Sequence, residues 1–576
     1  MKDRLAEELR GALRRLLEAA GDAGEPPEFA LEVPRNPEHG DFACNAAMLL
    51  ARRLGRPPRE IAARLVAQLG DAGGLVASAE IAGPGFVNLR LRETRWHDLL
   101  REILEAGEAW GRGDAGAGRR VQVEFVSANP TGPLTLGHGR QAVIGDCLAR
   151  LLENQGWDVT REYYFNDGGR QMRVLGESVR ARYLEQLGRA APPPPEAFEE
   201  GAEWPREIDG RPVLFPRDGY RGEYIAEIAR DLHAAHGEGL LEEPADGLFR
   251  EAAELEIFAG IRRTLDALGI RFDEYFNEKS LYGDGKLEAV LADLRARDLV
   301  EEAEGALWLR ATRLGLDRDR VLVKSTGEPT YLLPDIAYHR EKLRRGFDLV
   351  IDVQGADHFA QFPFVREATA ALGFDADAIT LVMHQFVTLT AGGRQVKQST
   401  RRATYVTVDE LLEDVGPDVF RYFMIHRKAD GHLDFDLELA REHDWRKNPA
   451  YYLQYAYART FGIERKAREL GAALPAAPDV DAARLDLPEE VELLKKLGEF
   501  PRLVAFAAES REPHHLAYYL RDLAGLWNPY VQDGVRHRIL SDDPGLTGAR
   551  LGLTLAVRCV LGRGLGLLGI GAPERM

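Results

Sequence analysis

The spacing of hydrophobic positions divides the chain into a mixed N-terminal region, a central region of alternating strands and helices, and a helical last third. Residues 1–20 carry Leu and Ala at helical intervals among charged residues, which predicts an amphipathic helix. Residues 79–89 show two apolar runs around a Gly-Pro-Gly turn, which predicts a pair of strands. We therefore expect residues 1–110 to form a small α/β domain.

The central region, residues 119–431, has the pattern of a parallel sheet. Two short apolar runs, 349–353 and 379–383, are typical of buried central strands. Another strand begins at about Arg120, with one face formed by Val121, Val123 and Phe125. Helical patterns separate these strands, and strands separated by helices pair in parallel, so we predict an α/β fold for this region.

Three further stretches depart from the pattern of alternating strands and helices. Residues 111–118 are rich in Gly and Ala and lack large apolar side chains, which is typical of a flexible connection between two cores. A Pro-rich, polar stretch around 188–223 is too irregular for a core element and is expected as a surface insertion. From 432 to 576 strand patterns largely vanish, and amphipathic helical patterns predict an all-helical domain.

Composition narrows the class of protein. The 576 residues include 93 Asp and Glu against 75 Lys and Arg, a formal charge of −18, which argues against a generally basic nucleic-acid coat protein. The odd number of widely spaced cysteines excludes a disulfide framework and a paired-cysteine zinc site, and fits a reducing cytoplasm. No stretch reaches the roughly 20 apolar residues of a membrane span, so no membrane role is expected.

The segment with the sharpest chemistry is 123–140, where a strand runs through a Pro/Gly turn into a helix that opens near Gly137. Ligands of open parallel sheets sit at the carboxyl ends of strands, and a helix N-terminus there offers free N–H groups to phosphate. Gly137 and Gly139 would let a nucleotide approach the backbone, while His138 can donate to a phosphate oxygen. For this segment taken alone, the favoured interpretation is a tight strand-to-helix turn in which Gly and Pro set the dihedrals and His138 caps the turn or faces water.

A second segment, 394–403, is a basic loop that precedes a helix expected from about Asp409. Only 11 of the 75 basic residues are lysines, so Lys397 stands out slightly. A flexible ammonium beside Ser399 and guanidinium donors suits the clamping of a polyphosphate. Taken alone, such a run is usually a solvated surface loop.

Together and in this order, the two segments resemble the His-Ile-Gly-His and Lys-Met-Ser-Lys-Ser elements of class I aminoacyl-tRNA synthetases. The longer text resembles bacterial-type arginyl-tRNA synthetases, in the family's order, at 40–42, 127–133, 144–146, 163–171, 355–358, 448–455 and 568–576. The resemblance implies a Rossmann-like parallel-sheet catalytic domain over 119–431, an N-terminal α/β domain that contacts tRNA, and an all-α anticodon-binding domain over 432–576.

Two departures from the family's motifs concern the phosphate-binding segments. Thr135 stands where the first His is usual, and Gln398 stands where the lysine loop usually has Met. A threonine hydroxyl still donates to phosphate, so the resemblance implies retuned rather than lost activity.

The resemblance also implies a role for individual residues. ATP phosphates would contact Thr135, Gly137 and His138, with Lys397 and Ser399 on the pyrophosphate and Mg²⁺ bound through the ATP phosphates. L-arginine would be bound by Glu124, Ser127, Asn129, Tyr331 and Asp335. Further contacts to ATP or substrate are implied for Gln171, Asp357 and His358.

The residues alone leave other interpretations of these carboxylates open. Glu124 lies opposite the apolar strand face, where an exposed or salt-bridged carboxylate is usual. Pro334 fits the first position of a helix and Asp335 the next, where an acid simply favours the helix dipole. Tyr331 and Asp335 share a face only if that helix begins at Tyr331.

Residues 441–470 carry a positive local charge, in contrast to the negative net charge of the whole chain. Seven basic residues against four acidic ones leave a local charge of +3, interleaved with aromatic rings that suit unstacked RNA bases. An amphipathic helix with an inward tyrosine face has the same pattern. The resemblance implies tRNA contacts through Arg446, Lys447, Tyr455 and Arg459. We expect a cytoplasmic monomer whose partners are L-arginine and its tRNA, without DNA or membrane partners.

Three functions fit these observations. The leading one is ATP-dependent attachment of L-arginine to its tRNA through an arginyl-adenylate. A tRNA-binding relative that has lost activation is the second, motivated by Thr135 and Gln398. A small-molecule nucleotidyltransferase is the third, motivated by Thr-x-Gly-His alone, although such an enzyme needs no helical tRNA-reading domain.

Overall fold

The computed structural model describes residues 2–34, 36–165, 167, 169–199, 201–356, 359–396 and 406–576. The chain forms two compact units. The first comprises Met1–Trp110, Arg459–Phe500 and Gly525–Val560, and the second comprises Gly111–Ala458, Pro501–Ala524 and Leu561–Met576. The helical last third is thus shared between the two units, and the domain boundaries expected near 110 and 431 stay predictions.

The first unit begins with the expected amphipathic helix. Helix α1 (Lys2–Ala19) buries Leu5, Leu9 and Leu13 and packs on α3 (Pro58–Leu69). An antiparallel sheet follows in the order β1 (Leu31–Glu32), β2 (Phe42–Cys44), β4 (Phe86–Leu91) and β3 (Val76–Ala82). The strand pair predicted at 79–89 is confirmed as β3 and β4. Helices α2 (Ala46–Leu54) and α4 (Glu93–Ala106) complete this part of the unit.

The second unit is built on a sheet of five strands that all pair in parallel, as predicted. Its order is β14 (Ile379–His384), β13 (Leu349–Gly355), β5 (Arg120–Glu124), β6 (Asp158–Phe165) and β9 (Glu274–Asn277). The run 349–353 is central, but the run 379–383 lies at the sheet edge, so its prediction as a central strand was wrong. The apolar composition of a strand indicates how far the faces of the sheet are buried there. It does not indicate whether the strand has neighbours on both sides.

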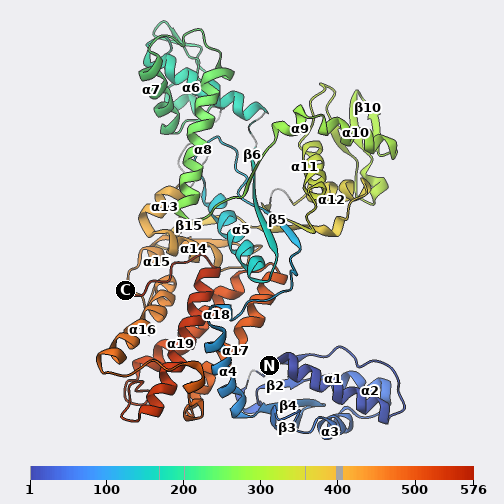
Figure 1. Ribbon diagram of the computed structural model, residues 1–576. Coiled ribbons are helices and arrows are strands. Elements are labelled where there is room, and N and C mark those ends of the chain that lie inside the picture. The colour runs from blue at the N-terminus through green and yellow to red at the C-terminus, as the bar shows by residue number, and fades with distance from the viewer. Residues whose placement is uncertain are drawn as a thin grey trace. The chain divides into compact units, whose positions relative to one another are not determined.

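Helices cover this sheet and carry the residues of interest. Helix α5 (Leu136–Asn154) packs against β5, β6 and β13. A separate core joins α9 (Lys279–Gly283), α10 (Lys286–Ala296), α11 (Leu332–Arg344), α12 (Phe362–Ala371) and an antiparallel sheet of β10 (Val300–Ala303), β11 (Ala306–Leu309) and β12 (Arg320–Val323). Helices α6 (Gly169–Gln186), α7 (Glu223–His236) and α8 (Arg250–Ala267) pack together (Figure 1).

The Gly/Ala-rich stretch 111–118 is hydrogen-bonded rather than flexible, which corrects the expectation. Gly113 and Gly116 donate backbone N–H groups to the carbonyls of Asn154 and Gln155 at 3.0 and 2.8 Å. A Cβ built on Gly116 would lie 2.5 Å from the Trp157 nitrogen. Glycine therefore serves close backbone approach here. The expected insertion holds one short hairpin, β7 (Glu207–Ile208) with β8 (Arg211–Pro212), among irregular segments.

The prediction of helices alone from residue 432 was wrong for one short segment. Residues 433–436 form β17 (Leu433–Asp436), which pairs in parallel with β15 (Val387–Ala391), and β16 (Arg394–Gln395) completes that sheet. Leu433 and Phe435 are buried while the intervening aspartates are exposed, an alternation of period two that four residues barely reveal. The remaining helices are α13 (Val408–Val415), α14 (Pro417–Ile425), α15 (Leu437–Arg441), α16 (Pro449–Glu469), α17 (Pro488–Glu509), α18 (His514–Gln532) and α19 (Pro544–Leu567).

None of the described helices contains a stretch that is both long enough and apolar enough to cross a membrane.

Candidate functional site

Helix α5 begins where the turn after β5 ends, as predicted for the first motif. Thr135 is the N-cap residue, and its backbone N–H donates to His138 Nδ1 at 3.2 Å. The Thr135 hydroxyl oxygen lies equally close, 3.2 Å from the same nitrogen. Thr135 and His138 are therefore coupled at a helix N-terminus, where the dipole favours an anion.

The two glycines of this motif have different roles. A Cβ on Gly137 would meet only the Thr135 hydroxyl at 3.8 Å, so a ligand can approach the backbone there. A Cβ on Gly139 would lie 2.6 Å from Phe420 and 3.0 Å from Val408. The expectation that Gly139 admits a nucleotide was wrong, because this glycine lets α5 pack against α13 and α14.

Residues just after the second motif contact the start of the first motif. Lys397 and Ser399 lie outside the described residues, as do Asp357 and His358. Thr407 forms a β-bridge with Thr135, and the Val408 N–H donates to the Leu134 carbonyl at 2.9 Å. The starts of α5 and α13 therefore lie side by side, although they are far apart in the sequence.

A strained turn ends strand β5. Val126 and Ser127 have φ angles of 68° and 41°, which are rare for residues other than glycine and cost about 1–3 kcal/mol each. The turn directs the Ser127 hydroxyl to donate to Glu124 Oε1 at 2.9 Å and to accept from the Tyr164 N–H at 3.1 Å. Strain of this kind persists only where surrounding contacts fix it.

Glu124 is buried and ion-paired, so the second of the two interpretations open for this strand carboxylate holds. Lys342 Nζ donates to Glu124 Oε2 at 2.5 Å and to Asp352 Oδ1 at 2.6 Å. Lys342 is 0% exposed and Glu124 5% exposed. Burial alone would lower the pKa of Lys342, but Asp352 and Glu124 raise it above its usual value. The sequence analysis missed Lys342, whose only signal was its rarity in an arginine-rich chain.

Tyr331 and Asp335 lie about one helical turn apart, although the helix begins one residue after Tyr331, where the sequence condition placed its start. Helix α11 begins at Leu332, two positions before Pro334, and the Asp335 N–H donates to the Tyr331 carbonyl at 3.2 Å. The expectation that Pro334 opens the helix was wrong, because proline is tolerated throughout a first turn whose N–H groups lack intrahelical partners. Gln361, which the sequence analysis missed, donates to Asp335 Oδ2.

A third carboxylate, Glu278, joins this region and was also missed. Burial, Glu278 and Asp335 raise the pKa of Tyr164, and Glu124 contributes in the same direction. Tyr282 donates its hydroxyl to Glu278 Oε1 at 3.2 Å. Glu278, Asp335 and Glu124 therefore all act electrostatically on one tyrosine, and their negative charges suit a cation. Glu278 lies in a short segment without a motif, so no sequence signal marked it.

Two further expected contacts also come together. Asn129, in the turn between β5 and α5, donates its side-chain amide to Gln171 Oε1 of α6 at 2.6 Å. This bond joins a residue predicted for arginine to one predicted for a further substrate contact.

A cavity of about 340 Å³ adjoins Tyr331 and Gln361. Its other walls include Trp308 and two guanidinium groups, those of Arg318 and Arg320. Asp319 also lines the cavity, so its charged side chains leave a net positive lining, which is unfavourable for the side chain of arginine.

The residues predicted to contact tRNA differ in their exposure and in their partners within the protein. Arg446 is exposed, with its guanidinium 5.0 Å from the Trp445 ring centre. Lys447 is exposed and pairs with Glu442 at 3.0 Å. Tyr455 stacks on Trp445 at 3.8 Å, so its ring has an intramolecular partner. Arg459 falls in the first unit and donates to the Asn528 carbonyl at 3.3 Å.

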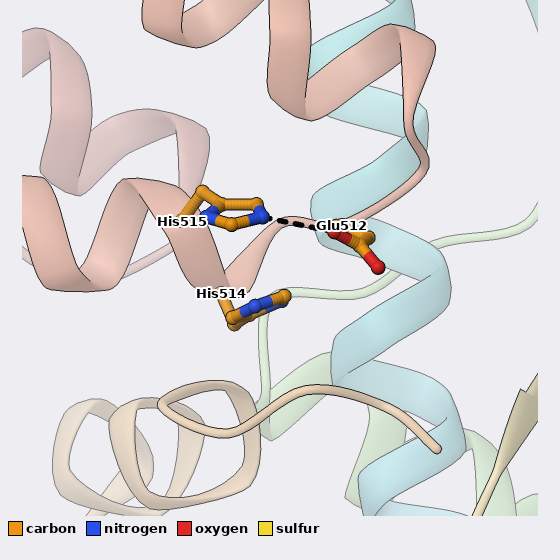
Figure 2. Close-up of side chains that lie close together, drawn as sticks. All are labelled: Glu512, His514 and His515. Carbon is orange, nitrogen blue, oxygen red and sulfur yellow. Dashed lines mark hydrogen bonds and ion pairs between the residues drawn. The ribbon is translucent and has the colours of Figure 1, made fainter. Parts of the chain in front are cut away.

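Figure 2 shows a second group of chemically versatile side chains, Glu512, His514 and His515, at the start of α18. Among the residues that the structure describes, they are the one group of three or more His, Cys, Asp or Glu close enough to hold a metal ion. His515 Nε2 lies 2.8 Å from Glu512 Oε2, and Lys428 Nζ lies 3.2 Å from Glu512 Oε1. Both carboxylate oxygens are thus engaged, which assigns the group to the packing of α18.

Three family models match the chain. The arginyl tRNA synthetase N terminal domain matches 3–91, the catalytic domain of class I (R) tRNA synthetases matches 100–192 and 225–422, and the DALR anticodon binding domain matches 453–576. Two curated relatives called Arginine--tRNA ligase are 48% identical: that of Desulfotalea psychrophila over 95% of both chains, and that of Salinibacter ruber over 99% of both. The chain belongs to the arginyl-tRNA synthetase family.

Solved structures of the family agree with this assignment. The chain resembles Thermus thermophilus arginyl-tRNA synthetase with a TM-score of 0.73 and 26% identity, over 99% of both chains. A Plasmodium falciparum arginyl-tRNA synthetase, with a TM-score of 0.70 and 16% identity over 99% of both chains, shares the fold.

Some of the residues that resemble the synthetase family stabilise the fold and take no part in the proposed chemistry. Arg421 of α14 is buried, and it donates to Asp146 Oδ2 at 2.5 Å and to the Leu568 carbonyl at 2.9 Å. Gln454 donates to Asp418 Oδ2 at 2.7 Å and to the Gly571 carbonyl at 2.9 Å. The matched residues Asp146, Gln454 and Leu568 thus help to tie the end of the chain to α5, α14 and α16.

Proposed function

We propose that this protein attaches L-arginine to its tRNA in two steps. In the first, a carboxylate oxygen of arginine attacks the α-phosphorus of ATP, the bond to the β-phosphate breaks, and arginyl-adenylate and pyrophosphate result. In the second, a hydroxyl of the terminal ribose of the tRNA attacks the activated carbonyl and AMP leaves. Family membership supports the overall reaction. The observation that carries it is two carboxylates held by hydrogen bonds, Glu124 by Ser127 and Lys342 and Asp335 by Gln361, because arginine brings two positive charges.

The arginine site is assigned from the charges. Glu124, supported by Ser127 and Asn129, receives the α-ammonium end of the substrate. Asp335 and Tyr331 receive the guanidinium, whose planar fork matches a carboxylate. The bond from Gln361 fixes one oxygen of Asp335 and so orients the other.

The ATP site is assigned to the start of α5. Thr135, the open backbone at Gly137, and His138 contact the triphosphate, and Lys397 with Ser399 holds the leaving pyrophosphate. Mg²⁺ enters with the ATP phosphates as part of the substrate, so few protein carboxylates are needed for it. Gln171, Asp357 and His358 supply further contacts.

The tRNA is assigned to exposed cations. Arg446, Lys447 and Arg459, with the Tyr455 ring, contact its backbone and bases, and the N-terminal domain contacts it elsewhere. We propose that the protein works in the cytoplasm as a monomer, with neither DNA nor a membrane as partner.

A substitution at Glu124 tests the arginine site. Glu124→Gln keeps the shape of the side chain and removes its charge, so the KM for arginine should rise about 10- to 100-fold, as expected for a charged hydrogen bond. Aminoacylation with labelled arginine provides the measurement. Glu274→Gln is the matched control, because Glu274 is exposed on β9 of the same sheet. A wild-type protein that attaches no arginine would overturn the proposed function itself.

The alternatives from the sequence gain no support. Thr135 is integrated with His138 at the helix start, and the relatives at 48% identity are called Arginine--tRNA ligase. A matched anticodon-binding domain disfavours a small-molecule nucleotidyltransferase. Pyrophosphate exchange that depends on arginine would separate activation from mere tRNA binding.

A further inference from the structure

A row of carboxylates crosses the centre of the parallel sheet. Asp352 of β13 pairs in register with Glu124 of β5, which pairs in turn with Glu162 of β6. All three are buried. Like charges at paired positions repel, so such a row persists only with cations placed between its members.

Helix α11 and its C-cap residue supply those cations. Lys342 Nζ bonds Glu124 and Asp352, and Arg345 donates twice to Glu162, at 2.5 and 2.9 Å. When His339 is neutral, three carboxylates face two cations, and one negative charge remains unmatched. Glu162 has its own partner, because Arg345 donates to both of its oxygens. Glu124 and Asp352 share the one ammonium of Lys342. The unmatched negative charge therefore lies with Glu124 and Asp352.

The same helix connects this excess charge to the other end of the arginine site. His339 Nε2 lies 2.7 Å from Asp352 Oδ2, and its Nδ1 lies 2.8 Å from the Asp335 carbonyl oxygen. Lys342 also lies 4.2 Å from the centre of the Tyr338 ring, which restricts its ammonium further. Each oxygen of Glu124 is anchored, Oε2 by Lys342 and Oε1 by Ser127.

We propose that Lys342, held by Asp352, is a positioning residue for arginine binding. It fixes the plane of the Glu124 carboxylate, and the α-ammonium of the substrate neutralises the unmatched negative charge. Each anchored oxygen retains a lone pair for that ammonium. This inference rests on the proposed function of Glu124, and it assigns no contact between Lys342 and the substrate.

The test uses a variant with balanced charge. Lys342→Met alone leaves two buried carboxylates unpaired, whereas Lys342→Met with Asp352→Asn removes one charge of each sign. The double variant should raise the KM for arginine at least about 10-fold with an unchanged KM for ATP. Lys342→Arg keeps the charge and should recover part of the affinity.

Two comparisons keep the test decisive. Lys324→Met, at an exposed lysine of the same unit, is the control and should match the wild type. Asp352→Asn alone keeps the ammonium but loosens it, so it gives a smaller increase in the KM for arginine if the double variant fails to fold. A wild-type KM for arginine in the folded double variant or in the folded Asp352→Asn variant, beside an impaired Glu124→Gln, would overturn the inference alone. An unimpaired Glu124→Gln would instead overturn the proposed arginine site.

Discussion

Two buried carboxylates near the first motif, Asp146 on α5 and Glu124 on β5, have opposite charge surroundings. Asp146 is 1% exposed and accepts from Arg421 at 2.5 Å and from Arg150 at 2.8 Å, while Arg161 Nε lies 3.8 Å away. Burial tends to raise the pKa of Asp146, but Arg421 and Arg150 lower it below its usual value. Glu124, by contrast, shares a single ammonium with a second carboxylate, Asp352, whose other oxygen lies 2.7 Å from His339 Nε2.

The difference teaches how to separate a structural carboxylate from one that awaits a ligand. A carboxylate surrounded by several cations is already neutralised and stabilises the fold. A pair of carboxylates that shares one cation keeps a negative charge in a region of low dielectric, where a cationic substrate gains most from binding. Burial is common to both, so the sign of the local charge balance carries the information.

The largest expected effect is on stability. Asp146→Asn leaves the Arg421 guanidinium buried without its carboxylate and should cost about 3–5 kcal/mol in the free energy of unfolding measured with urea. The KM for arginine of the folded protein should stay near that of the wild type. Asp158→Asn, at an exposed aspartate of β6, is the control and should change stability by less than about 0.5 kcal/mol. A large rise in the KM for arginine in Asp146→Asn would break the comparison.

The proposed role of Lys397 differs from that of the cations around Asp146 and Glu124, because its charge is needed mainly while the reaction takes place. Lys397→Ala should lower kcat about 100-fold with little change in the KM for arginine, because the pyrophosphate charge develops as the bond breaks. Steady-state kinetics of pyrophosphate exchange measures both constants. Equal losses in binding and rate would assign Lys397 to ground-state binding instead.

Exposed cations should have smaller and more uniform effects than buried ones. Arg446→Ala and Lys447→Ala should each weaken tRNA binding several-fold and reduce the slope of log affinity against log salt by about 1. Filter binding at several salt concentrations gives the slope. An unchanged slope would show that these side chains make no phosphate contact.

The smallest expected effect concerns the cluster at the start of α18. Partial burial and the neighbouring His515 lower the pKa of His514 to about 4. An unfolded histidine titrates near about 6.5, so the unfolded state binds more protons between these values, and stability is lost as the pH falls through this window. His514→Gln should flatten the fall of Tm below about pH 6.5. His443→Gln, at an exposed histidine, should leave the fall unchanged, and an equal slope in both variants would contradict the assignment.

Much of the fold and part of the site could be predicted from local pattern. The parallel sheet, the helix after 123–135 and the pairing of 79–89 follow from periodicity, which depends only on neighbours in the sequence. The family resemblance, rather than periodicity, implied Glu124, Asn129, Thr135, His138 and Asp335 as candidates, and their roles stay predictions. Gly139 and the edge position of 379–383 were misjudged, because a glycine's neighbours and a strand's partners come from distant segments.

The sequence by itself determined which residue types stand at the carboxyl ends of the strands and at the start of α5, and in what order. The tertiary structure decided which of them share a charge. The paired positions of Asp352 and Glu124 come from strand register, and Lys342 reaches both only because α11 packs above that row. Long-range pairing of this kind depends on topology, which hydrophobic periodicity does not encode, and it separates the carboxylate that stabilises the fold from the one proposed to bind arginine.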